Sequence, residues 1–344
     1  MRAMAVVDYQ KPLQLMDLPD PVRKPGHVML KILTCGVCFS DYKTSKGLMH
    51  YSDTLPLPHV PGHEICGEVI ESEAGSPWQP GDMVIAYHYW SCGTCVYCQR
   101  GLENLCINLE SWTGFTHHGG FEEFLSVPED RLLRVPAGLS PAQASTATCA
   151  SGTAFRATVT RGQVAPGDTV VIIGTGGVGL MATQFATLSG GAVIGLDIDQ
   201  RKLDIIKGFG VAGTARSEAE ARALVDELTR GIGADVIINT ISNPAGFKTA
   251  ANLVRRGGRI VGVGYYAGKN AEFETANMVL NEYEVLGSRY ALRYEMQRVL
   301  DLFAAGKVQA MVDSILPLED ANEAFRRLAE GEVVGRTVLR VAND

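Results

Sequence analysis

Two patterns of hydrophobic and polar positions divide the chain near residue 150. Before that point, short β-like runs are separated by Pro and Gly, for example at 27–32, 67–70 and 82–85. From about Thr153 onward, buried apolar strands alternate with helical segments. This alternation is typical of a doubly wound parallel sheet. The pattern predicts an antiparallel β barrel or sandwich followed by an α/β domain.

The second pattern predicts individual elements. We expect apolar strands at 170–173, 193–196, 236–238 and 260–263, and helices at 177–188 and near 200–207. After about residue 288 a helical segment at 294–305 precedes a strand at 337–341, which we predict to return to the first domain. The predicted divisions are therefore 1–150, 151–288 and 289–344.

Composition limits the classes of partner. A chain of 344 residues with 46% apolar content is long enough for more than one core. The net charge of −7, with no cluster of Lys or Arg, argues against nucleic acid and membranes as partners, so a small molecule fits better. No apolar stretch approaches the roughly 20 residues of a membrane span, and residues 1–4 lead into a strand pattern rather than a signal peptide. We expect a cytoplasmic protein.

A glycine-rich turn follows the first strand of the α/β domain. The strand at 170–173 is followed by G-x-G-x-x-G and then by an apolar helix. Such a turn brings backbone and a helix N-terminus close to a pyrophosphate. A second strand ends at Asp197, about 20 residues further on, where a carboxylate binds the ribose 2′-hydroxyl and disfavours a 2′-phosphate. The sequence therefore predicts that NAD binds here, with Asp197 and Lys202 at the ribose. The pyrophosphate would lie on the turn made of Gly174, Gly176, Gly177, Val178 and Gly179. Arg201 is the feature that would weaken the preference for NAD over NADP.

Four of the eight cysteines lie within one short segment, at Cys92, Cys95, Cys98 and Cys106. In a chain without an export signal, close thiols serve metal binding more often than disulfides. Four thiolates match a closed tetrahedral zinc site, which leaves no position for a substrate. The alternatives are disulfides, which the compartment disfavours, and an iron–sulfur cluster, which the spacing does not exclude. We predict a structural zinc.

A second set of metal-ligand residue types is dispersed along the chain. Cys38, His63 and Cys149 are far apart in sequence, and their spacing does not link them. Taken one at a time, a buried Cys is usually a small apolar residue and a lone His a satisfied polar group. Two cysteines and one histidine nevertheless form a known catalytic zinc set with an open fourth position.

The order of these motifs resembles that of the zinc-containing medium-chain alcohol dehydrogenases over essentially the whole chain. The matching motifs are Gly-x-Cys-x-Ser-Asp at 36–41, Gly-His-Glu at 62–64 with Gly67, the four-cysteine segment, and the glycine-rich turn. The resemblance implies a GroES-like β-barrel catalytic domain built from both chain ends, with an inserted Rossmann domain. It also implies two zinc ions per chain, one catalytic and one structural, and hydride transfer between an alcohol or carbonyl compound and NAD.

The resemblance also assigns roles to residues. It implies that Cys38, His63 and Cys149 bind the catalytic zinc, with Glu64 as an occasional ligand or a neighbour of the ligands. By the same resemblance Asp41 orients His63, and Ser40 hydrogen-bonds the substrate oxygen. Contacts to the cofactor are implied for three further residues: Thr153 and Val263 at the nicotinamide and Arg336 at the pyrophosphate.

Several positions bear on the substrate and on proton transfer. Phe39 replaces a cation that such enzymes often place near the pyrophosphate, which predicts weaker cofactor binding. Lys43 lies where a histidine often ends the proton relay, and an ordinary lysine is protonated at neutral pH. The aromatic residues expected at the substrate pocket favour an apolar or cyclic substrate over a polyol; they are Tyr87, His88, Tyr89, Trp90 and Trp112. Cys35 and Cys66 are read as buried structural thiols.

Other readings of the sequence predict different features. A polyol or sugar dehydrogenase shares the resemblance but usually has a more polar pocket. A non-catalytic nucleotide-binding relative, or a zinc-free quinone-reductase-like relative, predicts loss of Cys38, His63 or Cys149, and all three are present. Relatives are commonly homodimers or homotetramers, and the apolar strand 284–287 is the expected edge for such contact.

Overall fold

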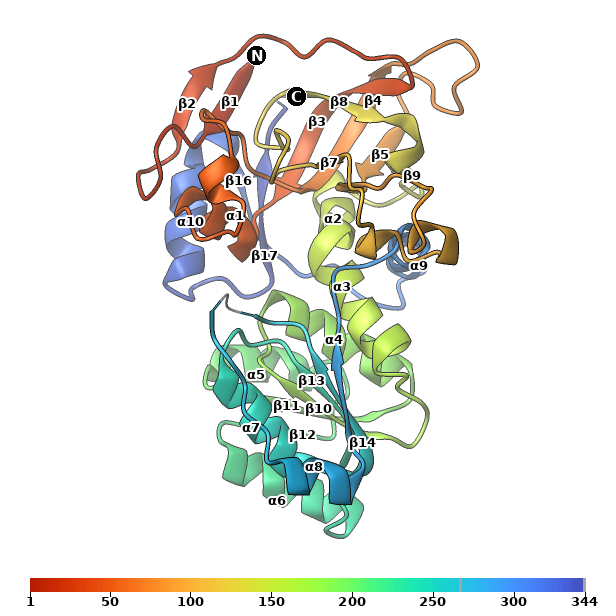
Figure 1. Cartoon of the computed structure of the whole chain (residues 1–344), viewed down its shortest axis with the longest axis vertical. Helices are drawn as coiled ribbons and strands as arrows, with labels where there is room; N and C mark the ends of the chain where they lie inside the picture. The colour runs from red at the N-terminus through yellow and green to blue at the C-terminus, as the bar shows by residue number, and fades with distance from the viewer. Residues whose placement is uncertain (266–267, 343–344) are drawn as a thin grey trace. The chain divides into compact units, whose positions relative to one another are not determined.

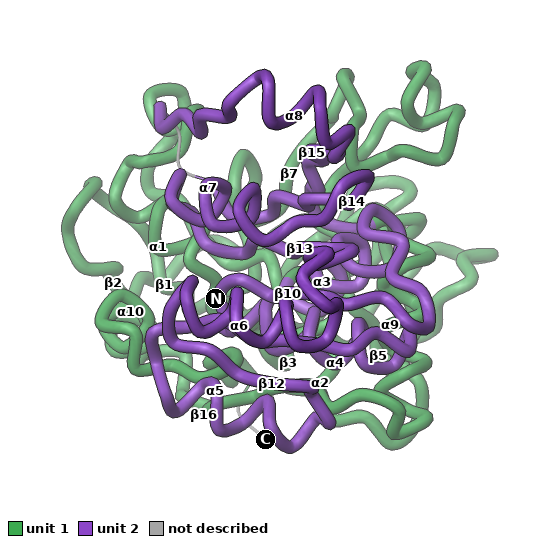
Figure 2. The backbone as a smooth tube through the Cα atoms, turned by 90° about the horizontal axis from the view of Figure 1, so that it is seen from below, with its two compact units in different colours: residues 1–149, 292–344 green, residues 150–291 purple. Residues whose placement is uncertain are grey.

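The computed structural model describes residues 1–265 and 268–342. It contains two compact units, shown in different colours in Figure 2: Met1–Cys149 together with Leu292 onward, and Ala150–Ala291. The sequence places the second boundary at 288 rather than 291. Ser288 still belongs to the second unit, because its backbone N–H donates to the carbonyl of Gly262 at 2.9 Å.

Unit 1 is built on a seven-stranded, mainly antiparallel sheet (Figure 1). Six strands follow the order β16-β17-β3-β4-β5-β9, and β8 also pairs with β3. Two small sheets, β1-β2 and β6-β7, accompany it. The strands are β1 (Arg2–Ala5), β2 (Gln14–Asp17), β3 (His27–Gly36), β4 (Glu64–Glu71), β5 (Met83–Ala86), β6 (Tyr89–Trp90), β7 (Ser111–Trp112), β8 (Phe124–Pro128), β9 (Leu132–Arg134), β16 (Val312–Pro317) and β17 (Arg336–Arg340).

Among the described residues, four α-helices belong to the same unit, namely α1 (Phe39–Ser45), α2 (Pro141–Thr146), α9 (Arg293–Ala304) and α10 (Ala321–Ala329). Strand β17 comes from the C-terminal part of the chain and pairs antiparallel with β3, with Leu339 opposite Cys35. Its first four residues are buried. Strand β17 therefore lies in the same sheet as β3, inside the core of unit 1.

Unit 2 contains a six-stranded parallel sheet in the order β12-β11-β10-β13-β14-β15. This is the strand order of a dinucleotide-binding fold, with the order reversing beside β10. The strands are β10 (Thr169–Ile173), β11 (Ala192–Leu196), β12 (Gly213–Ala215), β13 (Ala234–Asn239), β14 (Val254–Gly262) and β15 (Glu284–Gly287). The helices are α3 (Gly152–Phe155), α4 (Gly177–Leu188), α5 (Gln200–Lys207), α6 (Glu218–Thr229), α7 (Pro244–Leu253) and α8 (Thr275–Asn281).

Periodicity predicted most of the long apolar elements of unit 2 within a residue or two, but β14 begins at Val254, six residues before the predicted start at 260. Helices α4 and α5 begin and end where expected, and β14 ends at Gly262 rather than at residue 263. Strand β12 was not predicted, because its three residues, Gly-Thr-Ala, carry almost no apolar signal. No helix in the described ranges is long and apolar enough to cross a membrane.

His59 is a buried imidazole in unit 1, only 2% exposed, and its Nε2 lies 3.2 Å from the carbonyl oxygen of Gly114. Burial lowers the pKa of His59 from 6.5 to about 4. Between these pH values the unfolded chain binds a proton that the folded chain does not, so stability falls as pH decreases through this window. We expect about 3 kcal/mol of unfolding free energy to be lost there.

The measurement is urea unfolding at several pH values for the wild type and for His59→Gln, which keeps an N–H donor but does not titrate. The wild type should lose more stability than the variant between pH 6.5 and pH 4. Parallel stability curves for the two proteins would show that His59 is not the titrating group.

Candidate metal centres and dinucleotide site

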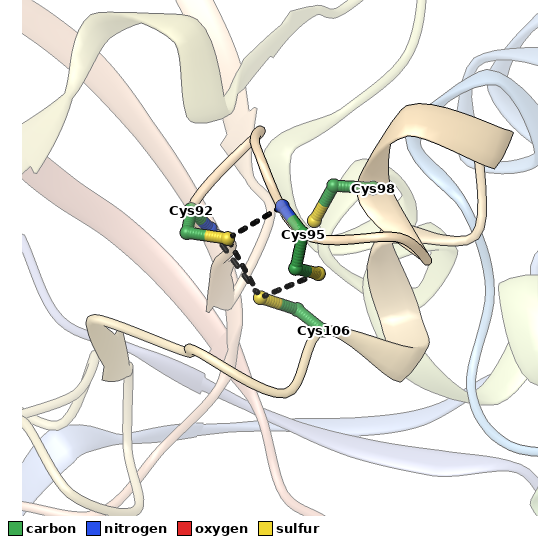
Figure 3. Close-up of side chains that lie close together, drawn as sticks. All are labelled: Cys92, Cys95, Cys98 and Cys106. Carbon is green, nitrogen blue, oxygen red and sulfur yellow. Dashed lines mark hydrogen bonds between the residues drawn. The ribbon is translucent and has the colours of Figure 1, made fainter.

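Four cysteines converge in the segment between β6 and β7 (Figure 3). Their sulfur atoms all lie within 4.8 Å of one another. The backbone N–H groups of Cys92 and Cys95 each donate to a neighbouring sulfur at 3.4 Å. Backbone donors, first that of Cys98, lower the pKa of Cys95 to about 6. The backbone therefore favours the thiolate of Cys95, whereas burial raises the pKa values of Cys98 and Cys106. Four cysteine sulfurs in this arrangement fit a structural zinc, whose binding would deprotonate the thiols.

A second cluster assembles from three distant parts of the chain. Cys38 precedes α1, His63 and Glu64 lie at the start of β4, and Cys149 lies in a π-helical turn, Ala147–Ser151. One ligand atom from each of these four residues lies within 4.8 Å of the others. His63 and Glu64 are buried almost completely, at 1% and 0% exposure. The structure thus brings together all the predicted ligands of the catalytic zinc.

Asp41 organises this cluster. One of its carboxylate oxygens accepts the backbone N–H of Cys38 at 2.8 Å. The other lies 2.8 Å from Nδ1 of His63 and accepts the N–H of Gly62 at 3.2 Å. Because Asp41 occupies Nδ1, the nitrogen of His63 that remains for a metal is Nε2. The predicted orienting role of Asp41 rests on this geometry.

The charges around Cys38 favour its thiolate form. A hydrogen bond from Cys149 lowers the pKa of Cys38 well below its ordinary value, against the opposing effect of burial, and Arg336 and His63 add to this lowering. Burial alone would lower the pKa of His63, but Asp41 and Cys38 outweigh it and raise that pKa. A buried thiolate beside a second thiol and an imidazole is the donor set of a catalytic zinc.

Glu64 and Arg336 form a buried ion pair in unit 1. A nitrogen of the Arg336 guanidinium lies 3.1 Å from a carboxylate oxygen of Glu64, and the same group donates to the carbonyl of Val37 at 3.3 Å. Burial raises the pKa of Glu64, and Arg336 opposes the rise. The predicted contact of Arg336 with the pyrophosphate remains a prediction, whereas its contact with Glu64 was not anticipated.

The glycine-rich turn follows β10 in unit 2. Gly174 has a φ of +85°, and a Cβ at Gly179 would lie 1.9 Å from the carbonyl oxygen of Gly174. A Cβ at Gly176 would meet nothing within 4 Å, so its backbone borders open space. Helix α4 begins at Gly177 and Val178 follows, so free backbone N–H groups of the first turn lie beside that space. This cradle fits a pyrophosphate.

Asp197 follows β11 and braces the turn. One of its oxygens accepts the N–H and the hydroxyl of Thr175, at 2.7 and 3.1 Å. Two of the nearby cations are held by Asp199, since Lys202 lies 3.8 Å and Arg201 2.7 Å from its carboxylate. The guanidinium of Arg201 is therefore engaged in an ion pair with Asp199, which competes with any contact to a 2′-phosphate.

Comparison with known proteins shows the family of this chain. Residues 24–137 match the family model for an alcohol dehydrogenase GroES-like domain, and residues 177–305 match the zinc-binding dehydrogenase model. An alcohol dehydrogenase of Geobacillus stearothermophilus is 34% identical, over 100% of both chains. The chain belongs to the zinc-containing medium-chain alcohol dehydrogenases.

Other members of the family extend the comparison. An NAD-dependent alcohol dehydrogenase of Sulfurisphaera tokodaii is 33% identical, over 98% of this chain and 99% of the relative. The solved structure of a cobalt- and zinc-bound thermostable alcohol dehydrogenase of Pyrobaculum aerophilum has a TM-score of 0.89 and 28% identity, over 99% of each chain. The protein is an oxidoreductase that uses zinc and NAD, and it converts an alcohol to an aldehyde or ketone. Its fold is the GroES-like and Rossmann combination that the sequence predicts.

Aromatic side chains surround His63 of this alcohol dehydrogenase. The rings of Phe115 and His88 lie 4.6 and 5.2 Å from that of His63, and Trp112 packs on Phe115 at 4.1 Å. Phe115 was missed by the sequence reasoning. The one signal in the sequence was the glycine immediately before it, Gly114. A side chain would not fit there, because a Cβ at Gly114 would lie 2.6 Å from the carbonyl oxygen of Gly62. The loop that carries Phe115 therefore packs directly on the segment that carries His63.

The remaining predicted residues are distributed as follows. Tyr87 stacks on His88 at 6.2 Å and Tyr89 on Trp112 at 5.3 Å, whereas Trp90 contacts His27 and His117. The hydroxyl of Ser40 lies 3.7 Å from the sulfur of Cys38. In unit 2, Thr153 is buried in α3, and Val263, just after β14, is half-buried. Cys35 and Cys66 are buried, as expected of structural thiols.

Asp197 supports a prediction about cofactor choice. Replacing it with serine removes the carboxylate that would repel a 2′-phosphate, so we expect kcat/KM with NAD to fall about tenfold and the NADP-to-NAD ratio to rise. Steady-state kinetics with both cofactors measures this. Asp204→Ser, which removes an exposed carboxylate of α5, is the matched control and should leave the ratio unchanged. An Asp197→Ser ratio equal to that of the control would contradict the ribose assignment.

Proposed function

We propose that Cys38, His63 and Cys149 hold the catalytic zinc of this alcohol dehydrogenase, with Glu64 beside them. The observation that carries the proposal is the convergence of these four ligand atoms within 4.8 Å, with Asp41 occupying Nδ1 of His63. Zinc bound there supplies a Lewis acid that polarises the substrate oxygen. The structural zinc belongs to the four-cysteine segment of Figure 3.

The side chains around this site would handle the proton and the cofactor. We assign to Ser40, whose hydroxyl lies 3.7 Å from the sulfur of Cys38, the hydrogen bond to the alcohol and the transfer of its proton. Lys43 follows on the same helix, and burial lowers its pKa, which makes it a better proton acceptor than an exposed lysine. We assign Thr153 and Val263 to the nicotinamide, and Asp197 and Lys202 to the ribose.

The substrate we propose is an apolar or cyclic alcohol or the corresponding carbonyl compound. The support is the aromatic surface beside His63, formed by His88, Trp112 and Phe115 together with Tyr51, which packs on both Trp112 and Phe115. Rings of this kind favour flat apolar groups and offer few partners for the hydroxyls of a polyol. A sugar or polyol dehydrogenase is the alternative within the same family.

The test is NAD reduction at near-ultraviolet wavelengths with 1-phenylethanol, cyclohexanol, ethanol and sorbitol. We expect kcat/KM to be about tenfold higher for the two cyclic alcohols than for sorbitol, and all turnover to disappear after a chelator removes zinc. Preference for sorbitol would replace the proposed substrate class by a polyol. Turnover that survives complete removal of zinc would contradict the metal assignment itself.

We also propose a cytoplasmic homodimer or homotetramer that associates through unit 2. Strand β15 is at the edge of the parallel sheet and exposes Val285, which gives a second copy an edge to pair with. The eight cysteines are free thiols, which suits a reducing compartment. A monomer mass in solution at micromolar concentration would rule out the association.

A further inference from the structure

A pocket of about 360 Å³ in unit 1 shares no residue with either metal cluster. It is formed by β3, β16, β17 and the start of α2, which belong to one compact unit. Its lining residues are Lys31, Leu33, Thr34, Ser140, Pro141, Ala142, Ile315, Arg340 and Ala342. None of these residues has a role in the proposed reaction.

Two cations, Lys31 and Arg340, line the pocket. Lys31 and Arg340 make no ion pair within 4.0 Å in the described part of the chain. Glu68, opposite Lys31 on β4, makes no such pair with it either. Other arginines of unit 1, such as Arg23 and Arg326, are each paired with glutamates. Among the described residues, the pocket is therefore lined by two cations that are not held in ion pairs.

A buried hydroxyl adds a second, independent feature. Thr34 is 7% exposed, and its Oγ1 is buried with no hydrogen-bond partner among the described residues. An unpaired buried hydroxyl is costly unless something else supplies its partner. Thr34 lies opposite Arg340 in the antiparallel pairing of β3 with β17, so the hydroxyl donor and the guanidinium belong to neighbouring positions of the sheet.

Apart from Ser140, the rest of the lining is apolar and comes from Leu33, Pro141, Ala142, Ile315 and Ala342. We propose that this pocket binds a phosphate monoester that carries a small apolar group. A dianionic phosphate matches the two cations and offers acceptors to the hydroxyl of Thr34. The apolar group would cover the aliphatic lining. This inference stands independently of the catalytic roles proposed above.

The test is isothermal titration calorimetry of the zinc-loaded enzyme with phenyl phosphate, in the presence of saturating NAD so that the dinucleotide site is filled. We expect one molecule bound per chain. Lys31→Met and Arg340→Met should each weaken binding about tenfold, and Thr34→Val about threefold, because each removes one contact to the phosphate. Lys24→Met, which removes an exposed lysine outside the pocket, is the matched control and should bind as the wild type does.

Two further comparisons use the wild type alone and do not depend on how well variants fold. Raising the KCl concentration should weaken binding, because the interaction is partly between exposed charges. Inorganic phosphate should bind more weakly than phenyl phosphate, because it leaves the apolar lining uncovered. The proposal would be overturned by the absence of saturable binding when NAD is present, or by unchanged affinity in both cation variants.

Discussion

Replacing Cys149 with serine is expected to reduce the zinc content from two ions per chain to one and to lower kcat/KM by about a thousandfold or more. The reason is geometric, because Cys149 is one of the four residues whose ligand atoms lie within 4.8 Å in the buried cluster. Serine is a poor zinc ligand at neutral pH, while the four-cysteine segment keeps its own ion. Metal analysis of the purified variant and NAD-reduction kinetics measure the two effects.

Cys66→Ala is the matched control. Cys66 is a fully buried thiol on β4, outside both clusters, and its removal should leave two zinc ions and nearly full activity. If Cys149→Ser retained both ions and wild-type kinetics, Cys149 would not be a ligand. If the control lost an ion as well, the loss would reflect disturbed packing of unit 1 rather than removal of a ligand.

Replacing Arg336 with methionine is expected to destabilise the protein by about 3–5 kcal/mol, because it leaves Glu64 buried without the guanidinium that pairs with it, so that the carboxyl group must stay unpaired from Arg336 or take up a proton. Arg336 is 6% exposed and Glu64 is 0% exposed, so water cannot take the place of the lost partner. The measurement is the free energy of unfolding from urea titrations of zinc-loaded protein. The double variant Glu64→Gln/Arg336→Met should recover part of the loss, because it buries no unpaired charge.

The exposed Arg340 of the same strand provides the comparison for this experiment. Arg340→Met should change the free energy of unfolding by less than about 0.5 kcal/mol, since it is a surface substitution without an ion pair among the described residues. Equal losses in Arg336→Met and Arg340→Met would mean that the buried ion pair is not the source of the effect.

Sequence patterns predicted the parts of the site that are formed by residues close together in the chain. The G-x-G-x-x-G turn could be predicted because the whole motif lies in one continuous strand, turn and helix. Gly174 has the positive φ that such a turn requires. The four-cysteine metal site could also be predicted, because its four cysteines lie in one short continuous segment. Asp197 was found from its distance along the chain and lies beside the turn, where it binds Thr175.

Contacts between residues that are far apart in the sequence could not be predicted from local patterns. Cys38, His63 and Cys149 were joined only through resemblance to a family, because nothing in their spacing brings them together. The pairing of Glu64 with Arg336 and the packing of Phe115 on His63 depend on the register of β3 with β17 and on a loop folded against Gly62. Alternating apolar residues predict a strand but do not specify its partner.

The discontinuous catalytic unit sets an order of events during synthesis. The segment of residues 150–291 that forms unit 2 leaves the ribosome complete, with all strands of its sheet, before β17 has been made. At about 5–20 residues per second, the chain between β3 and β17 takes about 15–60 s to synthesise, and β3 lacks its partner strand for that time. During that interval one edge of β3 lacks β17, and Glu64 lacks the guanidinium of Arg336. The nascent chain should therefore acquire protease resistance first in residues 150–291, and the buried metal cluster should mature only after β17 has been added.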